Sequence, residues 1–204
     1  MHSKSLLIVF VKKPVLGEVK TRLAKTVGDQ NALTIYKELL NITESETLNL
    51  ENCDLEIHFS NGISDEWWEN EVKKLQNGAN LGKKMLNAFD NGFKNGYEKI
   101  LLIGSDLPKI SAPLLKEGFA ALDQNNLVFG PAKDGGYYLI GMNKLYKNVF
   151  QNKPWSRENL LTVTLNELKN ETVCLLQELN DIDDYEDLME NPSLIKLIDQ
   201  QKLA

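Results

Sequence analysis

One acidic residue, Asp106, lies in the segment Gly104-Ser105-Asp106-Leu107-Pro108, directly after the apolar run 100–103. A short apolar run bounded by turn-forming residues predicts a buried strand, and Pro108 ends it because proline has no amide hydrogen to donate. Ligands of open α/β sheets bind at the carboxyl ends of strands. A carboxylate there can hold a divalent cation that bridges phosphates. The segment alone equally allows Asp106 to cap a helix starting near Ser111 or to close a turn.

A loop rich in cations, residues 12–22, follows an apolar run that predicts the first strand. It carries four cations and one glutamate, and Gly17 can adopt a positive φ that turns backbone amides toward an anion. Lysine offers a compact charge to phosphate and arginine a bidentate fork. The loop matches neither the Walker A pattern nor Gly-x-Gly-x-x-Gly. It is predicted to be exposed and to bind phosphates through Lys12, Lys20 and Arg22; the alternative is a solvated lysine loop.

Two further clusters have a functional and a structural interpretation. Asp134-Gly135-Gly136 precedes an apolar run and would let the backbone approach a ligand closely, but Asp-Gly is also a common hairpin turn. Asp181-Ile182-Asp183-Asp184 precedes a predicted helix. These acids can cap that helix and complement its dipole, or bring a second carboxylate to a metal. Taken alone, each cluster favours the structural interpretation.

The elements that must position these residues alternate between strands and helices. Strands are predicted over residues 6–11, 54–60, 99–104, 127–130, 137–141 and 172–176. Helices are predicted over residues 30–49, 81–94, 112–122, 159–168, 185–189 and 193–200. This alternation predicts an α/β fold with a mostly parallel sheet between helices. The two strands around residues 131–136 lack an intervening helix, so at least one antiparallel strand is expected. No repeat or linker interrupts the chain, which predicts a single domain over residues 1–204.

Composition narrows the class of function. With 204 residues, 42% of them hydrophobic and 25% charged, the chain is typical of a soluble α/β domain. The net charge of −6 argues against general nucleic-acid binding. The first apolar run is too short for a signal segment or a membrane span, so a cytoplasmic location without a membrane span is expected. Cys53 and Cys174 lack metal-ligand spacing, and His2 and His58 form no nucleophilic or zinc arrangement.

In chain order, these motifs resemble one known family. Its opening pattern Phe-x-Lys-x-Pro-x-x-Gly-x-x-Lys-Thr-Arg-Leu is matched by residues 10–23, and the later matches are Leu81-Gly82 with Met85, Gly104 to Pro108, Gly130-Pro131 with Asp134 to Tyr137, and Trp155-Ser156. The pattern resembles the uncharacterised bacterial glycosyltransferase-like proteins of the GT-A superfamily, of the radical-SAM/selenodomain-associated transferase type. It is more distantly similar to 2-phospho-lactate guanylyltransferase and molybdenum-cofactor guanylyltransferase. The resemblance covers residues 6 to about 190. Asn80 and Lys84 depart from it, because relatives often carry aspartate and arginine there.

The resemblance implies a nucleotide-diphospho-sugar transferase fold, Rossmann-like, with three α/β/α layers and a mixed sheet of about seven strands. It implies a metal-dependent transferase in which Asp106 and Asp183 hold Mg²⁺ or Mn²⁺. The nucleotide phosphates would contact Lys12, Gly17, Lys20, Arg22 and Gly82. Asp134 would position the acceptor or act as a base, which makes it, with Asp106, a candidate catalytic residue.

The expected partners are an NTP or a nucleotide sugar and an unknown small-molecule acceptor, so nucleotidyl and glycosyl transfer both remain open. The cation-rich loop and the single aspartate at position 106, in place of Asp-x-Asp, lean toward an NTP. A different class of function is also open, a non-catalytic module that binds a nucleotide or nucleotide sugar. Two potential metal ligands argue against that alternative, since a binding module does not need them.

Overall fold

One mixed sheet of seven strands runs through the computed structural model, which describes residues 4–198. The strands are β1 (Ser5–Val11), β2 (Asp54–Phe59), β3 (Val72–Leu75), β4 (Lys99–Ile103), β5 (Leu127–Pro131), β6 (Tyr137–Met142) and β7 (Val173–Leu175). Their order across the sheet is β3-β2-β1-β4-β6-β5-β7. β6 runs antiparallel to its neighbours β4 and β5, and the other pairs are parallel. The predicted mixed, mostly parallel sheet with an antiparallel strand is confirmed.

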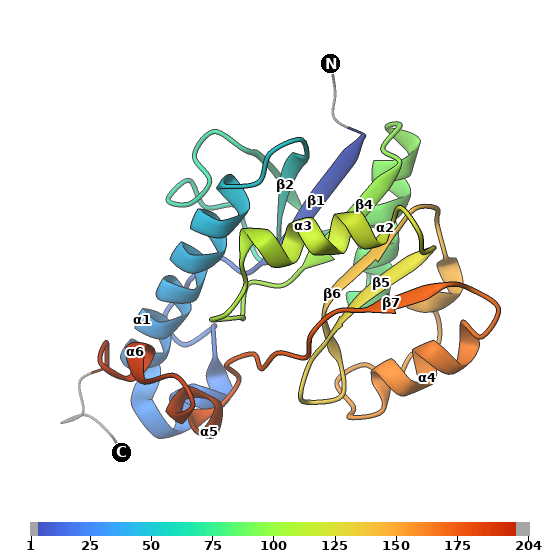
Figure 1. Cartoon of the computed structure of the whole chain (residues 1–204). Coiled ribbons are helices and arrows are strands. Elements are labelled where there is room, and N and C mark those ends of the chain that lie inside the picture. The colour runs from blue at the N-terminus through green and yellow to red at the C-terminus, as the bar shows by residue number, and fades with distance from the viewer. Residues whose placement is uncertain (1–3, 199–204) are drawn as a thin grey trace.

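Helices cover both faces of this sheet, as Figure 1 shows. α1 (Thr21–Leu48) and α3 (Ala112–Ala121) lie on one face. The other face is covered by α2 (Leu81–Lys94), the 3₁₀ helix η1 (Lys147–Phe150) and α4 (Leu160–Glu167). The short helices α5 (Tyr185–Met189) and α6 (Pro192–Ile195) pack against α1. None of the helices in this part of the chain has the length and apolar character needed to cross a membrane.

Alternate residues of β1 contribute to the cores on opposite faces of the sheet. Leu7 and Val9 pack in the core that includes Tyr36 of α1, whereas Leu6 and Ile8 pack in the core that includes α2. A strand covered by helices on both faces is apolar at every position, which explains the continuous aliphatic runs of β1 and β4. Burial on both faces fixes the position of these two central strands. The loops that follow them therefore begin at fixed points at the carboxyl ends of the strands.

One sequence prediction about the elements is wrong, and one strand was not predicted. α1 begins at Thr21 and not near residue 30, although Gly28 has non-helical angles (φ 79°, ψ 158°) inside it. Gly28 interrupts the apolar spacing, but the turns before it form because Leu23 and Val27 are buried in the core that α5 and α6 complete. The sequence also gave no indication of β3, an edge strand with two lysines at its centre and exposed apolar residues at its ends.

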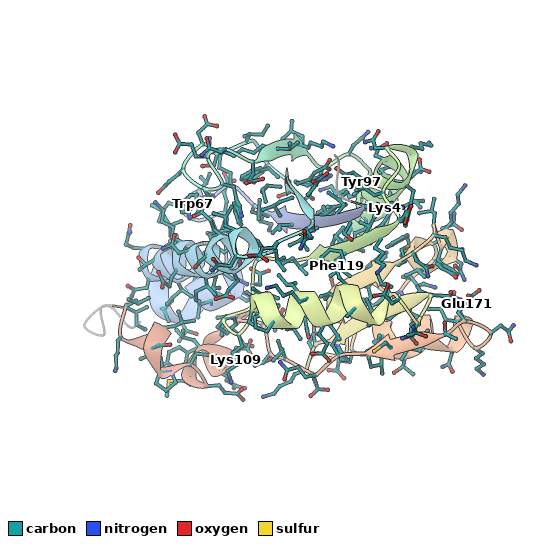
Figure 2. All side chains as sticks on the ribbon, turned by 45° about the horizontal axis from the view of Figure 1, so that its top comes forward. Lys4, Trp67, Tyr97, Lys109, Phe119 and Glu171 are labelled. Atoms are coloured by element: carbon teal, nitrogen blue, oxygen red, sulfur yellow. The ribbon has the colours of Figure 1, made fainter. Side chains whose placement is uncertain are left out.

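The remaining elements lie close to their predicted bounds, and α2 matches residues 81–94. The last predicted helix, 193–200, is observed as α6 over Pro192–Ile195, and its positions 199 and 200 lie outside the described residues. Trp67 and Trp68, whose role the sequence does not indicate, are buried, and Figure 2 shows Trp67 beside α1. Their indole nitrogens donate to side-chain oxygens of Asn41 and Thr47, each at 2.9 Å, and so attach the β2–β3 connection to α1.

Candidate functional site

A pocket of about 600 Å³ opens at the carboxyl ends of the central strands β1 and β4. These strands are parallel neighbours, and the sheet continues toward β2 on one side and β6 on the other. This is the place where open α/β sheets bind ligands. Six of the sequence-predicted site residues line the pocket: Lys12, Lys20, Arg22, Asp106, Asp134 and Asp183.

Two other predicted site residues, Gly17 and Gly82, are not among those that line the pocket. Gly17 adopts φ 77° in the loop after β1, which a side chain would strain. Gly82 lies in the first turn of α2, where a Cβ atom would come within 2.6 Å of the Trp155 ring. Its absent side chain therefore lets Trp155, which does line the pocket, pack against α2.

Asp106 directs its carboxylate into the pocket and does not cap the following helix. The N-cap of α3 is Ser111, whose Oγ accepts a hydrogen bond from the Leu114 amide. The side chain of Asp106 is 41% exposed. The peptide oxygen of Asp106 accepts a hydrogen bond from the Ile182 amide at 3.0 Å, which brings the C-terminal segment against the end of β4. The capping alternative for Asp106 is therefore wrong.

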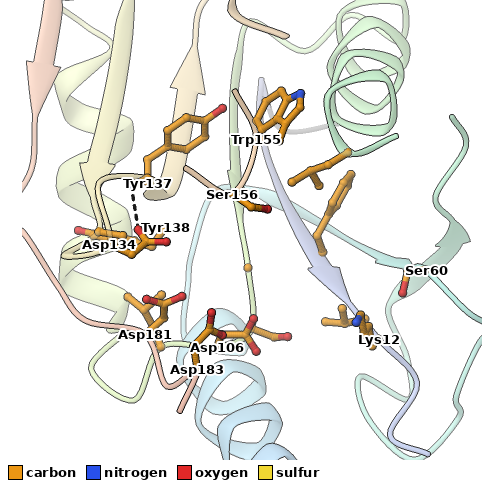
Figure 3. A pocket seen from close by; sticks show the side chains of 18 of the residues that line it. Lys12, Ser60, Asp106, Asp134, Tyr137, Tyr138, Trp155, Ser156, Asp181 and Asp183 are labelled. Atoms are coloured by element: carbon orange, nitrogen blue, oxygen red, sulfur yellow. Dashed lines mark hydrogen bonds between the residues drawn. The ribbon is translucent and has the colours of Figure 1, made fainter. Parts of the chain in front are cut away.

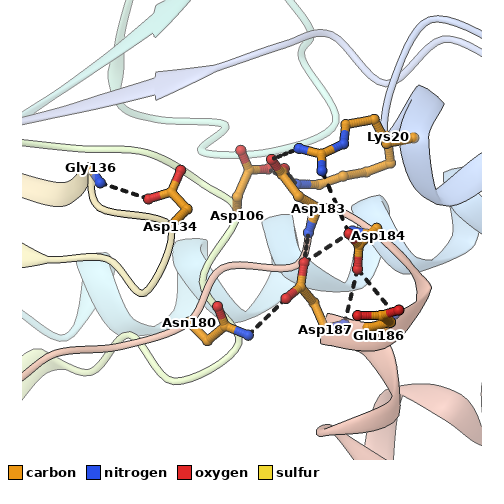
Figure 4. A network of polar contacts seen from close by, with 10 residues as sticks. Lys20, Asp106, Asp134, Gly136, Asn180, Asp183, Asp184, Glu186 and Asp187 are labelled. Atoms are coloured by element: carbon orange, nitrogen blue, oxygen red, sulfur yellow. Dashed lines mark hydrogen bonds and ion pairs between the residues drawn. The ribbon is translucent and has the colours of Figure 1, made fainter. Parts of the chain in front are cut away.

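In the acidic cluster before α5, neighbouring aspartates make different contacts, as Figure 4 shows. Asp184 is the N-cap of α5 and forms a capping box with Asp187. The Asp187 carboxylate also accepts the Asp183 amide at 2.9 Å. Capping is thus carried by Asp184 and Asp187, and the Asp183 carboxylate is left to face Asp106. The structural interpretation of this cluster therefore holds for Asp184 and Asp187, and the functional one stays a prediction for Asp183.

Lys20 connects the two carboxylates. Its Nζ lies 2.8 Å from Asp106 Oδ1 and 3.4 Å from Asp183 Oδ1, so residues 77 positions apart in sequence meet at one ammonium group. The side chain is only 5% exposed, so the prediction of an exposed loop is wrong for Lys20. Burial by itself lowers the pKa of Lys20, but the carboxylates of Asp106, Asp183 and Asp181 outweigh it and raise the pKa above its ordinary value.

Arg22 lies on the solvent side of the same group, with its side chain 66% exposed. Its guanidinium nitrogens lie 3.4 Å from Asp183 Oδ2 and 3.6 Å from Asp184 Oδ2. Ion pairs this exposed contribute little to stability. The prediction of an exposed side chain is confirmed for Arg22.

The residues present fit a divalent cation that takes some of its ligands from the protein and the others from a substrate. Asp106 and Asp183 offer hard oxygen ligands that converge on one point. Within the described residues, no group of three or more His, Cys, Asp or Glu side chains forms a candidate metal site. Magnesium is commonly bound through one or two carboxylates, with phosphates and waters as the other ligands. The arrangement matches that mode and not a site made entirely of protein ligands.

Two more carboxylates lie further along the pocket, on the side of β6 (Figure 3). Asp134 Oδ1 accepts the Gly136 amide at 2.8 Å, so the turn predicted for Asp-Gly-Gly is present, and the residue also lines the pocket. Asp181 belongs to the acidic cluster noted in the sequence, but no role was predicted for it individually. Burial, followed by the charges of Asp183 and Asp134, raises the pKa of Asp181 from 3.8 to about 6.

Tyr36 and Ser105 are pocket residues that sequence reasoning missed. The Tyr36 hydroxyl accepts the Lys12 amide at 2.9 Å, donates to the Lys12 peptide oxygen at 3.1 Å and lies 3.3 Å from Ser105 Oγ. It therefore joins the ends of β1 and β4. Nothing in the local sequence marks Tyr36, because its position on α1 looks like any other buried helical position.

The pocket lining also has an apolar part. Its apolar side chains include Phe10, Leu81, Met85, Leu102, Ile140, Trp155 and Leu160, and Lys84 of α2 lies among the lining residues as well. In Figure 3, Trp155 and Tyr137 stand across the cavity from Asp106 and Asp183. The pocket therefore offers both charged groups and apolar surface, which suits a ligand with an anionic part and a less polar part.

Comparison with known proteins supplies the family. Residues 43–157 match the family described as "Uncharacterized protein conserved in bacteria (DUF2064)". The chain belongs to this family. Among curated proteins, none matches this member of the family. The matched range includes Asp106 and Asp134, and the cation-rich loop (residues 12–22) and Asp183 lie outside it.

Solved structures share the fold. A proposed nucleotide-diphospho-sugar transferase from Desulfovibrio desulfuricans G20 is 29% identical with a TM-score of 0.85, over 95% of this chain and 97% of that one. The 4-diphosphocytidyl-2C-methyl-D-erythritol synthase of Anaerococcus prevotii is 12% identical with a TM-score of 0.61, over 95% and 99%. A cytidylyltransferase from Leptospira borgpetersenii is 12% identical with a TM-score of 0.57, over 100% and 91%. The fold predicted from the resemblance is confirmed. The narrower similarity to radical-SAM-associated transferases and guanylyltransferases stays a prediction.

Proposed function

We propose that this DUF2064 protein is a metal-dependent transferase with a nucleotide donor, either a nucleotidyltransferase or a glycosyltransferase, acting on a small-molecule acceptor as a single cytoplasmic domain. The observation that carries the proposal is the meeting of Asp106 and Asp183 with Lys20 at the carboxyl ends of β1 and β4. The D. desulfuricans protein, a proposed transferase of nucleotide diphospho-sugars, supports the donor class. So do two more distant neighbours of the same fold, a cytidylyltransferase and a CMP:2-keto-3-deoxy-manno-octonic acid synthetase solved with CTP.

The cations of the pocket would bind the donor phosphates. Lys12 follows β1 directly, and Arg22 is exposed at the rim. Fixed positive charges beside a leaving phosphate stabilise the negative charge that develops during transfer, without covalent chemistry. Mg²⁺ or Mn²⁺ held by Asp106 and Asp183 would neutralise charge on the same phosphates. The positions of Lys12 and Asp106 depend on Tyr36, which joins their two strands.

Asp134 is the residue proposed to contact the acceptor substrate. One carboxylate oxygen is held by the Gly136 amide, which orients the side chain along the pocket wall. An oriented carboxylate can accept a hydrogen bond from an acceptor hydroxyl and take up its proton as transfer proceeds. Asp134 and the pair of Asp106 and Asp183 would then stand on the acceptor and donor sides of the transferred group.

The proposal is tested by calorimetric titration of NTPs and nucleotide sugars with and without Mg²⁺ or Mn²⁺, on wild-type protein and on Asp106→Asn. We expect metal-dependent binding of one donor class, which Asp106→Asn weakens. The bound donor is then incubated with the small-molecule fraction of a bacterial extract as a source of acceptor. Release of pyrophosphate identifies nucleotidyl transfer, and release of the nucleotide identifies glycosyl transfer.

Two outcomes contradict the proposal. Binding of a donor without metal dependence, and without turnover in the extract, would support the non-catalytic binding module. Failure of both donor classes to bind, with or without metal, would remove the nucleotide from the function altogether.

A further inference from the structure

The ammonium of Lys20 contacts the carboxylates of both Asp106 and Asp183, and Figure 4 shows the three side chains together. Its side chain is nearly as buried as a core residue, with 5% exposed, whereas the two carboxylates are 41% and 43% exposed. Lys20 reaches this position from the N-cap of α1, with φ 47° and ψ 44°. The group therefore approaches the carboxylates from the protein side, and solvent reaches them from the pocket.

A divalent cation held by both carboxylates needs the same space. Ligand distances for Mg²⁺ are about 2.0–2.1 Å, so a cation bound to both Oδ1 atoms would lie between them. Lys20 Nζ is already within 2.8 and 3.4 Å of those two atoms. An ammonium and a divalent cation cannot share that gap, because they would be in contact and of like charge. Occupation by one excludes the other.

We infer that Lys20 keeps the carboxylate pair closed to divalent cations in the free protein, and that the pair opens when a phosphate of the substrate takes over the Lys20 ammonium. This inference rests on the proposed function, since it assigns the same carboxylates to the metal. Metal and phosphate then enter together, and neither is held strongly without the other. Lys20 acts as a positioning residue that links the two binding events.

The surroundings of Lys20 suit a phosphate as the group that receives it. Lys20 is the N-cap of α1, where no side chain caps the helix and no acidic residue occupies the first turn. The positive end of a helix and an ammonium both attract a phosphate. Arg22, two residues further and exposed, adds a second cation. A phosphate bound here would compete with Asp106 and Asp183 for the Lys20 ammonium and so draw it away from them.

The first experiment measures Mn²⁺ binding by electron paramagnetic resonance, with no nucleotide or phosphate present. Lys20→Met removes the ammonium and keeps most of the side-chain volume. Since a hydrogen bond between charged groups no longer has to be broken, we expect Lys20→Met to bind Mn²⁺ more tightly than wild type, on the order of tenfold. Lys94→Met is the matched control, because it removes an exposed lysine paired with Asp90 on α2, and it should bind Mn²⁺ as wild type does.

The double variant Lys20→Met with Asp106→Asn assigns the gain to the carboxylate pair, and we expect it to lose that gain. Equal Mn²⁺ affinity in wild type and Lys20→Met, with weaker binding in Asp106→Asn, would overturn the role of Lys20 and leave the proposed metal site standing. Affinity unchanged in all of these variants would overturn the inference and the metal part of the proposed function together.

A second measurement follows Lys20 in the wild-type protein and uses a variant only to assign its signal. The side-chain resonance of Lys20 in ¹³C-lysine-labelled wild type is identified by its absence in Lys20→Arg. Titration with Mg²⁺ alone should leave this resonance in place, and Mg²⁺ together with tripolyphosphate should shift it. A shift with Mg²⁺ alone at submillimolar concentration would show that the cation displaces Lys20 unaided, which contradicts the inference.

Discussion

Asp181 gives a test of the electrostatics of the pocket that requires no knowledge of the substrate. It is a partly buried carboxylate close to Asp183 and Asp134, and burial and these two charges raise its pKa from 3.8 to about 6. In the unfolded chain the group titrates near its ordinary value. The folded protein therefore binds this proton more tightly than the unfolded chain does, which favours folding at low pH and disfavours it once Asp181 is ionised.

The size of the effect follows from the shift. About two pH units correspond to about 3 kcal/mol between the protonated and ionised forms, and solvent screening of a partly exposed group reduces this to about 1–2 kcal/mol. Asp181→Asn removes the charge and keeps the shape. We expect the variant to be more stable than wild type by that amount at pH 7.5, with the difference shrinking as the pH falls from 6 toward 3.8 and vanishing below it.

Urea denaturation of wild type and Asp181→Asn at pH 7.5 and at pH 3.5 measures both differences in the free energy of unfolding. The matched control is Asp65→Asn, which alters a fully exposed aspartate and should leave stability nearly unchanged at pH 7.5. An Asp181→Asn variant less stable than wild type at pH 7.5 would refute the reasoning, as would a stability difference that is the same at both pH values.

Four further outcomes follow from the contacts of the site. Asp106→Asn should fold normally, since Ser111 caps α3, and should lose metal-dependent turnover on the order of 100-fold in a release assay. Lys20→Ala should lower the free energy of unfolding by about 1–3 kcal/mol, because it leaves partly buried carboxylates unpaired, whereas Arg22→Ala should change it by about 0.5 kcal/mol or less. Calorimetry should show weaker nucleotide binding in both variants. Equal melting temperatures of Lys20→Ala and Arg22→Ala would contradict the burial of Lys20. Asp184→Ala should lower the free energy of unfolding by about 1 kcal/mol through the lost cap, without a matching loss of nucleotide affinity. Asp184→Asn should restore the cap. A large fall in nucleotide affinity for Asp184→Asn would instead assign this residue to the site. Tyr36→Phe should lower the free energy of unfolding by about 1–2 kcal/mol, because the Lys12 amide loses its acceptor. It should also lower turnover in the same release assay. Unchanged turnover would show that Tyr36 does not position the two strands for the reaction.

The sequence by itself determined the layers of this protein and most of its elements. Continuous apolar runs identify β1 and β4 as central strands, because only strands buried on both faces are apolar at every position. The period of α2 and its Asn95-Gly96 end are likewise local signals, and they placed that helix within its observed bounds. Sequence motifs also placed Lys12, Lys20, Asp106 and Asp183 among the candidate site residues, since ligands bind where such strands end.

Only the tertiary structure determines which aspartate caps a helix and which one faces the pocket. Asp183 and Asp184 are neighbours with the same side chain, yet one caps α5 and the other faces Asp106, because the bond between the Ile182 amide and the Asp106 peptide oxygen sets the orientation of the segment. Lys20 looked like an exposed loop lysine because the residues that bury it, Asp106 and Asp183, lie far away in the sequence. Local sequence patterns report local backbone preferences, but the burial and charge of a side chain depend on groups that only folding brings together.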